Sequence, residues 1–248
     1  MSKVLIVTGG GRGIGAACAR LAGAKGYAVA VNYLANASRA EAVVEEIKAA
    51  GGRAIAVGAD VATEEGAAAL FGAADKAFGR LTALFNNAGT ILPSARLETV
   101  TAAELERLWR VNITSQFLCA REAVKRMSTK HGGTGGAIVN MSSVHARIGA
   151  PGAFVSYAAS KGAIDSLTHG LALEVVGEGI RVNAVRPGLI DTEIHALGGD
   201  PGRAHTVGRT VPIGRAGDPE EVARTVLWLL SDEASYVVNT LVDVGGGR

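Results

Sequence analysis

The chain has 248 residues, 48% of them hydrophobic and 19% charged, so it is long enough for one large domain and too apolar for intrinsic disorder. The 25 Lys and Arg residues against 23 Asp and Glu residues give a net charge of +2, which argues against nucleic acid as the main partner. Two isolated cysteines, Cys18 and Cys119, form neither a disulfide framework nor a metal cluster, and we expect two buried thiols. The apolar run Val4–Val7 is too short for a signal sequence and no run could span a membrane, so we expect a cytoplasmic protein.

The first half of the chain alternates short apolar runs with longer helical patterns. Such continuous apolar runs are typical of strands that are buried on both faces of a sheet. The predicted strands are Val4–Val7, Ala28–Val31, Ala54–Val57 and Leu81–Phe85, and the predicted helices are Ile14–Lys25, Ala37–Ala50 and Glu64–Phe78. This order predicts a parallel sheet with helices on both faces.

The second half continues the same alternation. The predicted helices are Thr101–Lys130, Ala153–Val176 and Pro219–Ser231, and the predicted strands are Ala137–Met141, Arg181–Val185 and Thr240–Val244. The segment at about 190–212 has little periodicity, and we expect a substrate loop or lid there. Because the alternation never breaks, we predict a single α/β domain over residues 1–248, with a Rossmann-type, doubly wound parallel sheet of about seven strands.

A glycine-rich turn, from Thr8 to Gly15, follows the first predicted strand and opens the first predicted helix. Glycine has no side chain to keep a phosphate away from the backbone, and the N–H groups of a helix N-terminus attract anions. This strand–turn–helix context predicts a dinucleotide site rather than an ordinary tight turn. The cofactor-binding residues expected in it are Gly9, Arg12, Gly13, Ile14 and Gly15.

Tyr157 and Lys161 lie four positions apart and therefore on one face of a predicted helix. A free phenol has a pKa near 10, and a nearby ammonium favours the phenolate and lowers that pKa. We therefore expect this pair to exchange a proton with a carbonyl or alcohol oxygen. Ser143 follows a predicted strand at the edge where open α/β sheets bind ligands, and its hydroxyl can stabilise a developing oxyanion.

The spacing of the glycine-rich turn, T-G-x-x-x-G-x-G, resembles that of the short-chain dehydrogenase/reductase family. Further family motifs follow in order along nearly the whole chain: Asp60, Asn86-Asn87-Ala88-Gly89, Asn112, Ser143, Tyr157-x-x-x-Lys161 and Pro187-Gly188. The resemblance implies that the catalytic residues are Asn112, Ser143, Tyr157 and Lys161, with Asn112 completing a water-mediated proton relay through Lys161. It adds to the cofactor site Asn32, Asp60, Val61, Asn87, Ala88, Gly89, Tyr157, Lys161, Pro187, Gly188, Ile190 and Thr192.

Ser142 is the alternative to Ser143 as the substrate-facing serine. The interval from Ser143 to Tyr157 is one residue longer than is usual in the family, and the interval from Ser142 is longer still. We prefer Ser143, and we expect the extra residue to loop out near Ala150–Ala153.

The choice of cofactor depends on the end of the second predicted strand. Members of the family that select NAD usually carry an acid there, whereas this chain has Val31-Asn32-Tyr33-Leu34. Arg12, with Arg39 as a weaker candidate, can make a charge-assisted contact with the additional 2′-phosphate of NADP. We therefore predict that NADP(H) is favoured over NAD(H).

The predicted reaction is hydride transfer between the nicotinamide and a carbonyl/alcohol pair of a small molecule; the alternative is a nucleotide-binding redox sensor without turnover. Within the family, the chain resembles 3-ketoacyl-carrier-protein reductases and glucose dehydrogenases, so the substrate stays open. A carrier protein would favour a basic patch, for which Arg147, Arg203 and Arg209 are candidates. The histidines lack metal-ligand spacing and we expect no metal, although His145 is close enough to Ser143 to face a substrate.

We also predict a homotetramer. Family members commonly pair their two longest helices, and both carry apolar residues that we expect to exceed the needs of the core: Leu105, Leu108, Val111, Phe117 and Leu118 on the first, and Leu167, Leu171 and Val175 on the second. The last strand, Thr240–Val244, offers a second interface, and two different two-fold interfaces generate a closed tetramer. The alternative is a monomer in which these residues serve only the core.

Overall fold

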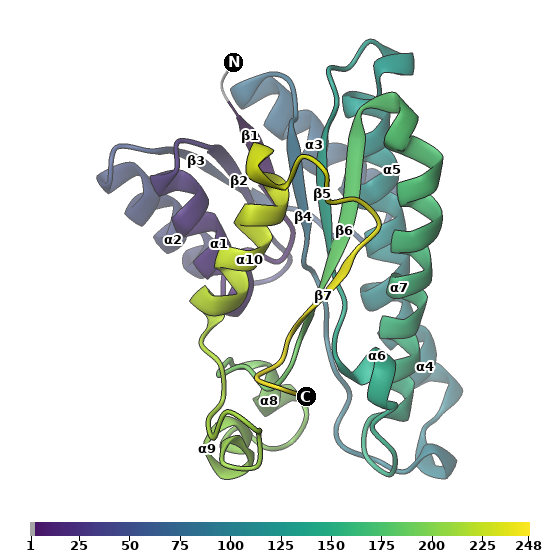
Figure 1. Ribbon diagram of the computed structural model, residues 1–248. Helices are drawn as coiled ribbons and strands as arrows, with labels where there is room; N and C mark the ends of the chain where they lie inside the picture. Colours follow the sequence, from purple (N-terminus) through teal and green to yellow (C-terminus); the bar gives the residue numbers. More distant parts are fainter. Residues whose placement is uncertain (1–2) are drawn as a thin grey trace.

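A seven-stranded parallel sheet forms the centre of the computed structural model, which describes residues 3–248 (Figure 1). The strands lie in the order β3-β2-β1-β4-β5-β6-β7, and every neighbouring pair is parallel. They are β1 (Val4–Val7), β2 (Ala28–Tyr33), β3 (Arg53–Gly58), β4 (Ala83–Asn86), β5 (Gly136–Met141), β6 (Ile180–Pro187) and β7 (Leu241–Val244). The predicted Rossmann-type fold is confirmed.

Helices cover both faces of this sheet (Figure 1). One layer contains α1 (Gly13–Ala24), α2 (Ala37–Ala49) and α10 (Pro219–Leu230), whose apolar side chains share a core with Leu5 and Val7 of β1. The other layer contains α3 (Glu64–Phe78), α5 (Ser115–Met127) and α7 (Val155–Val175), which pack on Val4 and Ile6 of the same strand. Alternate residues of one strand therefore serve two cores, which explains why the strands read as continuous apolar runs.

The predicted helix Thr101–Lys130 is wrong as a single element. The structure has α4 (Ala102–Trp109), a π-helical turn over Arg110–Thr114, then α5, and a 3₁₀ turn over Thr129–His131. The π turn carries Asn112, whose side chain bonds to Thr90 and Ser160 instead of lying on the helix surface. Apolar periodicity cannot reveal such a turn, because the helical pattern continues across it.

Three short helices were not predicted: α6 (His145–Ile148), α8 (Ile194–Leu197) and α9 (Arg203–Gly208). The latter two lie within the segment expected as a lid, and four to six residues are too few to display a period. The stretch Ala150–Ala153 forms the turn between α6 and α7, with a positive φ of 46° at Ala150.

Two residues predicted as part of a surplus apolar stripe belong to the core instead. Leu108 of α4 and Val175 of α7 are buried within the subunit. The apolar side chains that remain exposed on these helices include Phe117 (48%) and Leu173 (69%). The predicted stripe was therefore too wide and partly misplaced, because a sequence pattern does not show how far the neighbouring helix covers each position.

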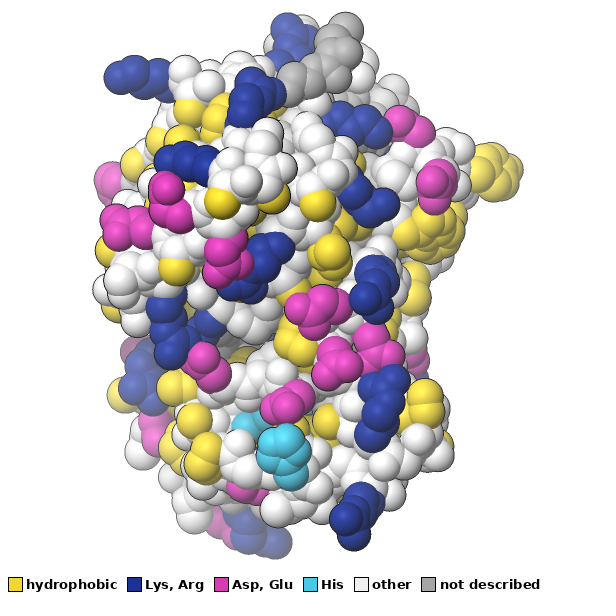
Figure 2. Space-filling view, turned by 90° about the vertical axis from the view of Figure 1, so that its left-hand side faces the viewer, with side chains coloured by type: hydrophobic (Ala, Val, Ile, Leu, Met, Phe, Trp, Pro, Cys, Tyr) yellow, Lys and Arg dark blue, Asp and Glu magenta, His cyan; other side chains and the backbone are white. Residues whose placement is uncertain are grey.

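Both cysteines are buried and free, as expected. The left-hand side of the molecule, seen head-on in Figure 2, carries Lys and Arg side chains interspersed with Asp and Glu side chains. No helix within residues 3–248 is long and apolar enough to cross a membrane.

Candidate active site

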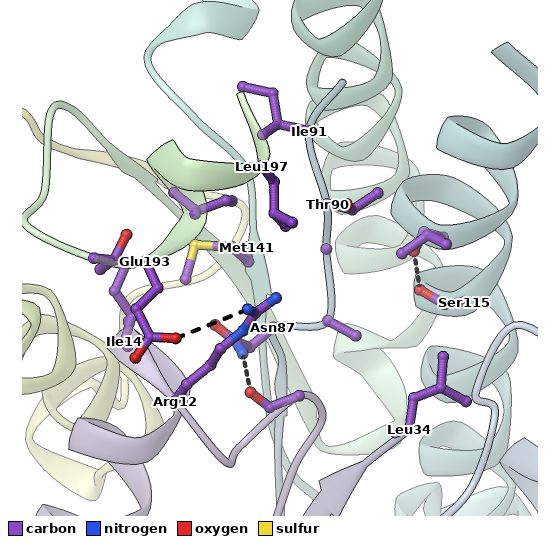
Figure 3. Close-up of a pocket in the computed structure, with 18 of the residues that line it drawn as sticks. Arg12, Ile14, Leu34, Asn87, Thr90, Ile91, Ser115, Met141, Glu193 and Leu197 are labelled. Atoms are coloured by element: carbon purple, nitrogen blue, oxygen red, sulfur yellow. Dashed lines mark hydrogen bonds and ion pairs between the residues drawn. The ribbon is translucent and has the colours of Figure 1, made fainter. Parts of the chain in front are cut away.

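A cavity of about 920 Å³ opens where the parallel strands end in their carboxyl direction (Figure 3). Its walls come from the segments that follow β1, β2, β3, β4, β5 and β6, together with α7. Every residue predicted to bind the cofactor lines this cavity, as do Ser142 and Ser143. Asn112 is the one predicted site residue that is not part of the wall. The topology thus brings together motifs that are spread over most of the chain.

The glycine-rich turn is held close to the segment after β4. Asn87 donates its Nδ2 to the Thr8 and Gly9 carbonyls at 2.8 and 3.1 Å, and its backbone N–H to Thr8 Oγ1 at 2.8 Å. A Cβ at Gly15 would lie 2.6 Å from Asn87 Nδ2 and from the Gly9 oxygen. The turn therefore has no room for a side chain at Gly15, and Asn87 supports its shape.

The N-terminus of α1 is open to an anion. Arg12 precedes the helix and places no side-chain acceptor on its first N–H groups. Gly9 and Gly13 adopt positive φ values of +61° and +50°, which residues other than glycine rarely adopt. Free N–H groups at the start of a twelve-residue helix fit the phosphates of a dinucleotide.

Asn32 and Asp60 line the cavity where the segments at the ends of β2 and β3 meet it. Asn32 is buried; its Oδ1 accepts from the Gly9 N–H at 3.2 Å, and its Nδ2 donates to the Ala59 carbonyl at 3.0 Å. Asp60 accepts from the Ala62 N–H at 3.0 Å and pairs with Arg110 at 2.8 Å. Sequence reasoning missed Arg110, because it lies 50 positions from Asp60 in the chain.

Ser143, Tyr157 and Lys161 also meet in the wall of the cavity. Lys161 Nζ lies 5.6 Å from the centre of the Tyr157 ring and donates to the Met141 carbonyl at 2.8 Å. Burial lowers the pKa of Lys161 to about 8, and Asp165 partly opposes this effect. At neutral pH, Lys161 therefore carries a positive charge beside the tyrosine.

The pKa of Tyr157 corrects one expectation. Burial raises this pKa to about 12, and a hydrogen bond with Ser143 opposes the rise, whereas the sequence argument expected Lys161 to lower it. Lys161 lies over the ring and donates to a backbone carbonyl, and burial rather than the lysine charge sets the pKa of Tyr157 here. Tyr157 is consequently protonated at neutral pH in this state.

The two neighbouring serines point to different partners. Ser142 donates to Asp165 Oδ1 at 2.6 Å and to the Lys161 carbonyl at 3.2 Å, while Asp165 also pairs with Arg186 at 2.6 Å. Ser143 contacts Tyr157 and accepts from the His145 N–H at 3.2 Å. This geometry favours Ser143 as the substrate-facing serine.

Asn112 lies behind the cavity wall and is fully buried. Its Oδ1 accepts from the Thr90 N–H at 2.7 Å, and its Nδ2 donates to the Thr90 carbonyl at 2.9 Å and to Ser160 Oγ at 3.0 Å. A Cβ at Gly89 would lie 3.5 Å from Asn112 Oδ1 and 3.6 Å from Lys161 Nζ. Asn112 and Lys161 thus approach the same point around Gly89.

His145 stands beside the tyrosine. Its ring lies 5.8 Å from the Tyr157 ring, edge to face, and 6.0 Å from the Phe154 ring. Burial lowers the pKa of His145 to about 4, so the ring is neutral at pH 7. Of the arginines considered for a carrier-protein patch, Arg203 lies over Phe154, whereas Arg147 pairs with Asp243 at 3.4 Å.

Glu193 is a cavity-lining residue that sequence reasoning missed. It follows Thr192 in the expected lid and forms ion pairs with Arg39 and with Arg12. Its two partners are the arginines predicted to contact a 2′-phosphate. Within residues 3–248 there is no group of three or more His, Cys, Asp or Glu side chains that could hold a metal ion.

Comparisons with known proteins find relatives along nearly the whole chain. A family model described as enoyl-(acyl carrier protein) reductase matches residues 9–248. The uncharacterized oxidoreductase YgfF of Escherichia coli is 52% identical over 99% of both chains, and 3β-hydroxysteroid dehydrogenase 1 of Eggerthella lenta is 42% identical over 99% of this chain and 93% of its own. The structure of a short-chain dehydrogenase/reductase from Serratia marcescens superposes with a TM-score of 0.89 at 35% identity, over 99% of this chain and 97% of the other.

Proposed function

Because the chain belongs to the short-chain dehydrogenase/reductase family, we propose that it transfers a hydride between NADP(H) and a small-molecule carbonyl/alcohol pair, with Tyr157 as the general acid and base. The observation that carries this proposal is that Ser143, Tyr157 and Lys161 share one cavity with the glycine-rich turn. In this proposal residues 1–248 act as one domain, with the segment at about 190–212 as the substrate loop.

The chemistry of the cavity lining suits a nicotinamide dinucleotide. The close approach of Gly15 to Asn87 and the uncapped N-terminus of α1 suit the phosphates. When bound, the cofactor supplies or accepts the hydride. The absence of an acid at the end of β2, with Arg12 and Arg39 in the wall, supports a preference for NADP(H) over NAD(H).

The proton chemistry follows from the environment of Tyr157. With a pKa of about 12, Tyr157 holds its proton at neutral pH and can donate it to a carbonyl oxygen as that oxygen gains negative charge. The Ser143 hydroxyl lies beside it and can donate a second hydrogen bond to the same oxygen. The Lys161 ammonium then stabilises the phenolate that remains, and Asn112 connects Lys161 to a proton relay.

The experiment is a screen of purified protein against ketones, aldehydes and alcohols, with each of the two cofactors in turn. The absorbance of the reduced nicotinamide measures turnover. We expect turnover of NADPH with at least one carbonyl compound. The matched control is Tyr157→Phe, which keeps the ring and loses the proton. It should bind NADPH normally and lose about 10²–10⁴-fold in rate. A loss of less than about tenfold would remove Tyr157 from the mechanism, and cofactor binding without any turnover would favour a redox sensor.

We further propose that the protein is a homotetramer. Exposed apolar side chains on α5 and α7, Phe117 and Leu173, support an interface between these helices of two subunits. Light scattering at micromolar concentration tests this proposal. A mass near one chain of 25.2 kDa would refute it. The mass of a dimer would mean that only one of the two predicted interfaces forms.

A further inference from the structure

The lid places an acid between the two arginines of the cofactor cavity. Arg12 comes from the turn after β1 and Glu193 from the segment after β6 (Figure 3). Arg39 comes from α2. Glu193 Oε2 pairs with Arg39 Nη1 and lies 4.0 Å from Arg12 Nη1. Within residues 3–248, neither arginine has an ion pair with any other acid.

The other acid in the wall of this cavity is already engaged elsewhere. Asp60 pairs with Arg110 at 2.8 Å, so it does not compete for Arg12 or Arg39. The side chains of Arg12, Arg39 and Glu193 are each about half exposed. An ion pair this exposed contributes little to the stability of the fold, so the carboxylate can be removed without unfolding the protein.

We propose that Glu193 is a specificity-determining residue that competes with the 2′-phosphate of NADP(H) for Arg12 and Arg39. This inference rests on the proposed function, because it needs a nicotinamide dinucleotide in this cavity. A 2′-phosphate carries up to two negative charges and would approach the arginines that the carboxylate now holds. It must either displace Glu193 or bind beside a like charge, and both weaken its binding.

NAD(H) does not meet this competition. It carries a neutral hydroxyl in place of the 2′-phosphate, so Glu193 can keep both arginines while NAD(H) binds. The carboxylate therefore weakens the binding of NADP(H) only. It reduces the preference for NADP(H) over NAD(H) that Arg12 and Arg39 create. Specificity of this kind comes from a repulsive element as well as from attractive ones.

The competition also couples cofactor identity to the lid. Glu193 belongs to the segment that continues into α8, and the neighbouring His195 Nε2 lies 2.8 Å from the Ile190 carbonyl. If the lid carboxylate weakens NADP(H) binding, then bound NADP(H) must weaken the attachment of the lid to Arg12 and Arg39 by the same factor. NAD(H) should leave that attachment in place.

The test compares the dissociation constants of NADPH and NADH for Glu193→Gln and the unaltered protein, measured at low ionic strength by titrating the fluorescence of the bound cofactor. Gln keeps the size of the side chain and removes its charge. We expect Glu193→Gln to bind NADPH about tenfold more tightly and NADH within about twofold of the unaltered protein. The matched control is Asp191→Asn, which removes a charge two positions away in the same segment, from a side chain without an ion pair to either arginine.

A second pair of variants tests whether the effect passes through the arginines. In an Arg12→Ser, Arg39→Ser background, Glu193→Gln should no longer act through the proposed competition, and the tenfold gain should fall below about threefold. Equal effects of Glu193→Gln on both cofactors, no effect, or weaker NADPH binding would each overturn the inference while leaving the proposed function intact. Failure of the unaltered protein to bind either cofactor would overturn both.

Discussion

Replacing each of the two adjacent serines by alanine should give opposite results. Ser142 is buried and donates to Asp165 Oδ1 at 2.6 Å. Loss of a hydrogen bond to a charged group costs about 1.5–3 kcal/mol of the free energy of unfolding. At about 2–4 °C per kcal/mol for a chain of this size, Ser142→Ala should lower Tm by roughly 3–12 °C. Because Arg186 still pairs with Asp165, we expect a value in the lower half of that range.

Ser143→Ala should instead affect the reaction. Its hydroxyl contacts Tyr157 and accepts a 3.2 Å bond from the His145 N–H, both neutral partners, so its loss should cost at most about 1.5 kcal/mol of stability. Removal of a donor to a developing oxyanion typically lowers kcat by about 10²–10³-fold. Ser142→Ala should keep kcat within about tenfold, since its hydroxyl is directed at Asp165 and the Lys161 carbonyl.

The assay pairs thermal unfolding with steady-state kinetics on the same preparations, using the carbonyl substrate identified by the screen. Unfolding gives Tm, and initial rates give kcat for reduction. The reasoning is refuted if Ser142→Ala loses more than about 10²-fold in kcat at an unchanged Tm while Ser143→Ala retains the rate. That pattern would exchange the roles of the two serines.

Three further perturbations test the rest of the site. Lys161 has a pKa of about 8, so the rate of reduction should fall as the pH rises through about 8 and the ammonium is lost; a flat rate from about pH 6 to 10 would contradict this. Arg12→Ser should weaken NADPH binding much more than NADH binding in a fluorescence titration, and equal losses would make Arg12 structural. Gly15→Ala should raise the Kd of NADPH at least about tenfold and destabilise the fold by about 1–3 kcal/mol, because its Cβ would lie 2.6 Å from Asn87 Nδ2. The control is Gly72→Ala, at a helical position where a Cβ meets nothing within 4 Å. It should leave the Kd of NADPH unchanged and should not lower the stability of the fold.

Local patterns in the sequence, together with the family resemblance, were sufficient for the fold and for the motifs that line the cavity. Strands buried on both faces are continuous apolar runs, and the sequence therefore placed all seven of them, with strand Val4–Val7 predicted to the residue. The helix Glu64–Phe78 was also predicted to the residue. The glycine-rich turn and the Tyr157–Lys161 spacing are equally local signals. Because parallel strands bring their carboxyl ends to one edge, motifs that follow different strands had to line one cavity.

The tertiary structure decided what depends on contacts between distant segments. Asn112 interrupts a helix whose apolar pattern continues, because Thr90 and Ser160 draw its side chain inward. Arg39 and Glu193 are 154 positions apart, and no sequence pattern predicts their ion pair. The pKa of Tyr157 rises because burial outweighs the hydrogen bond with Ser143, and burial exists only after the chain has packed. Sequence periodicity thus determines which residues face a sheet or a solvent, whereas pairings and protonation follow from distances that only packing sets.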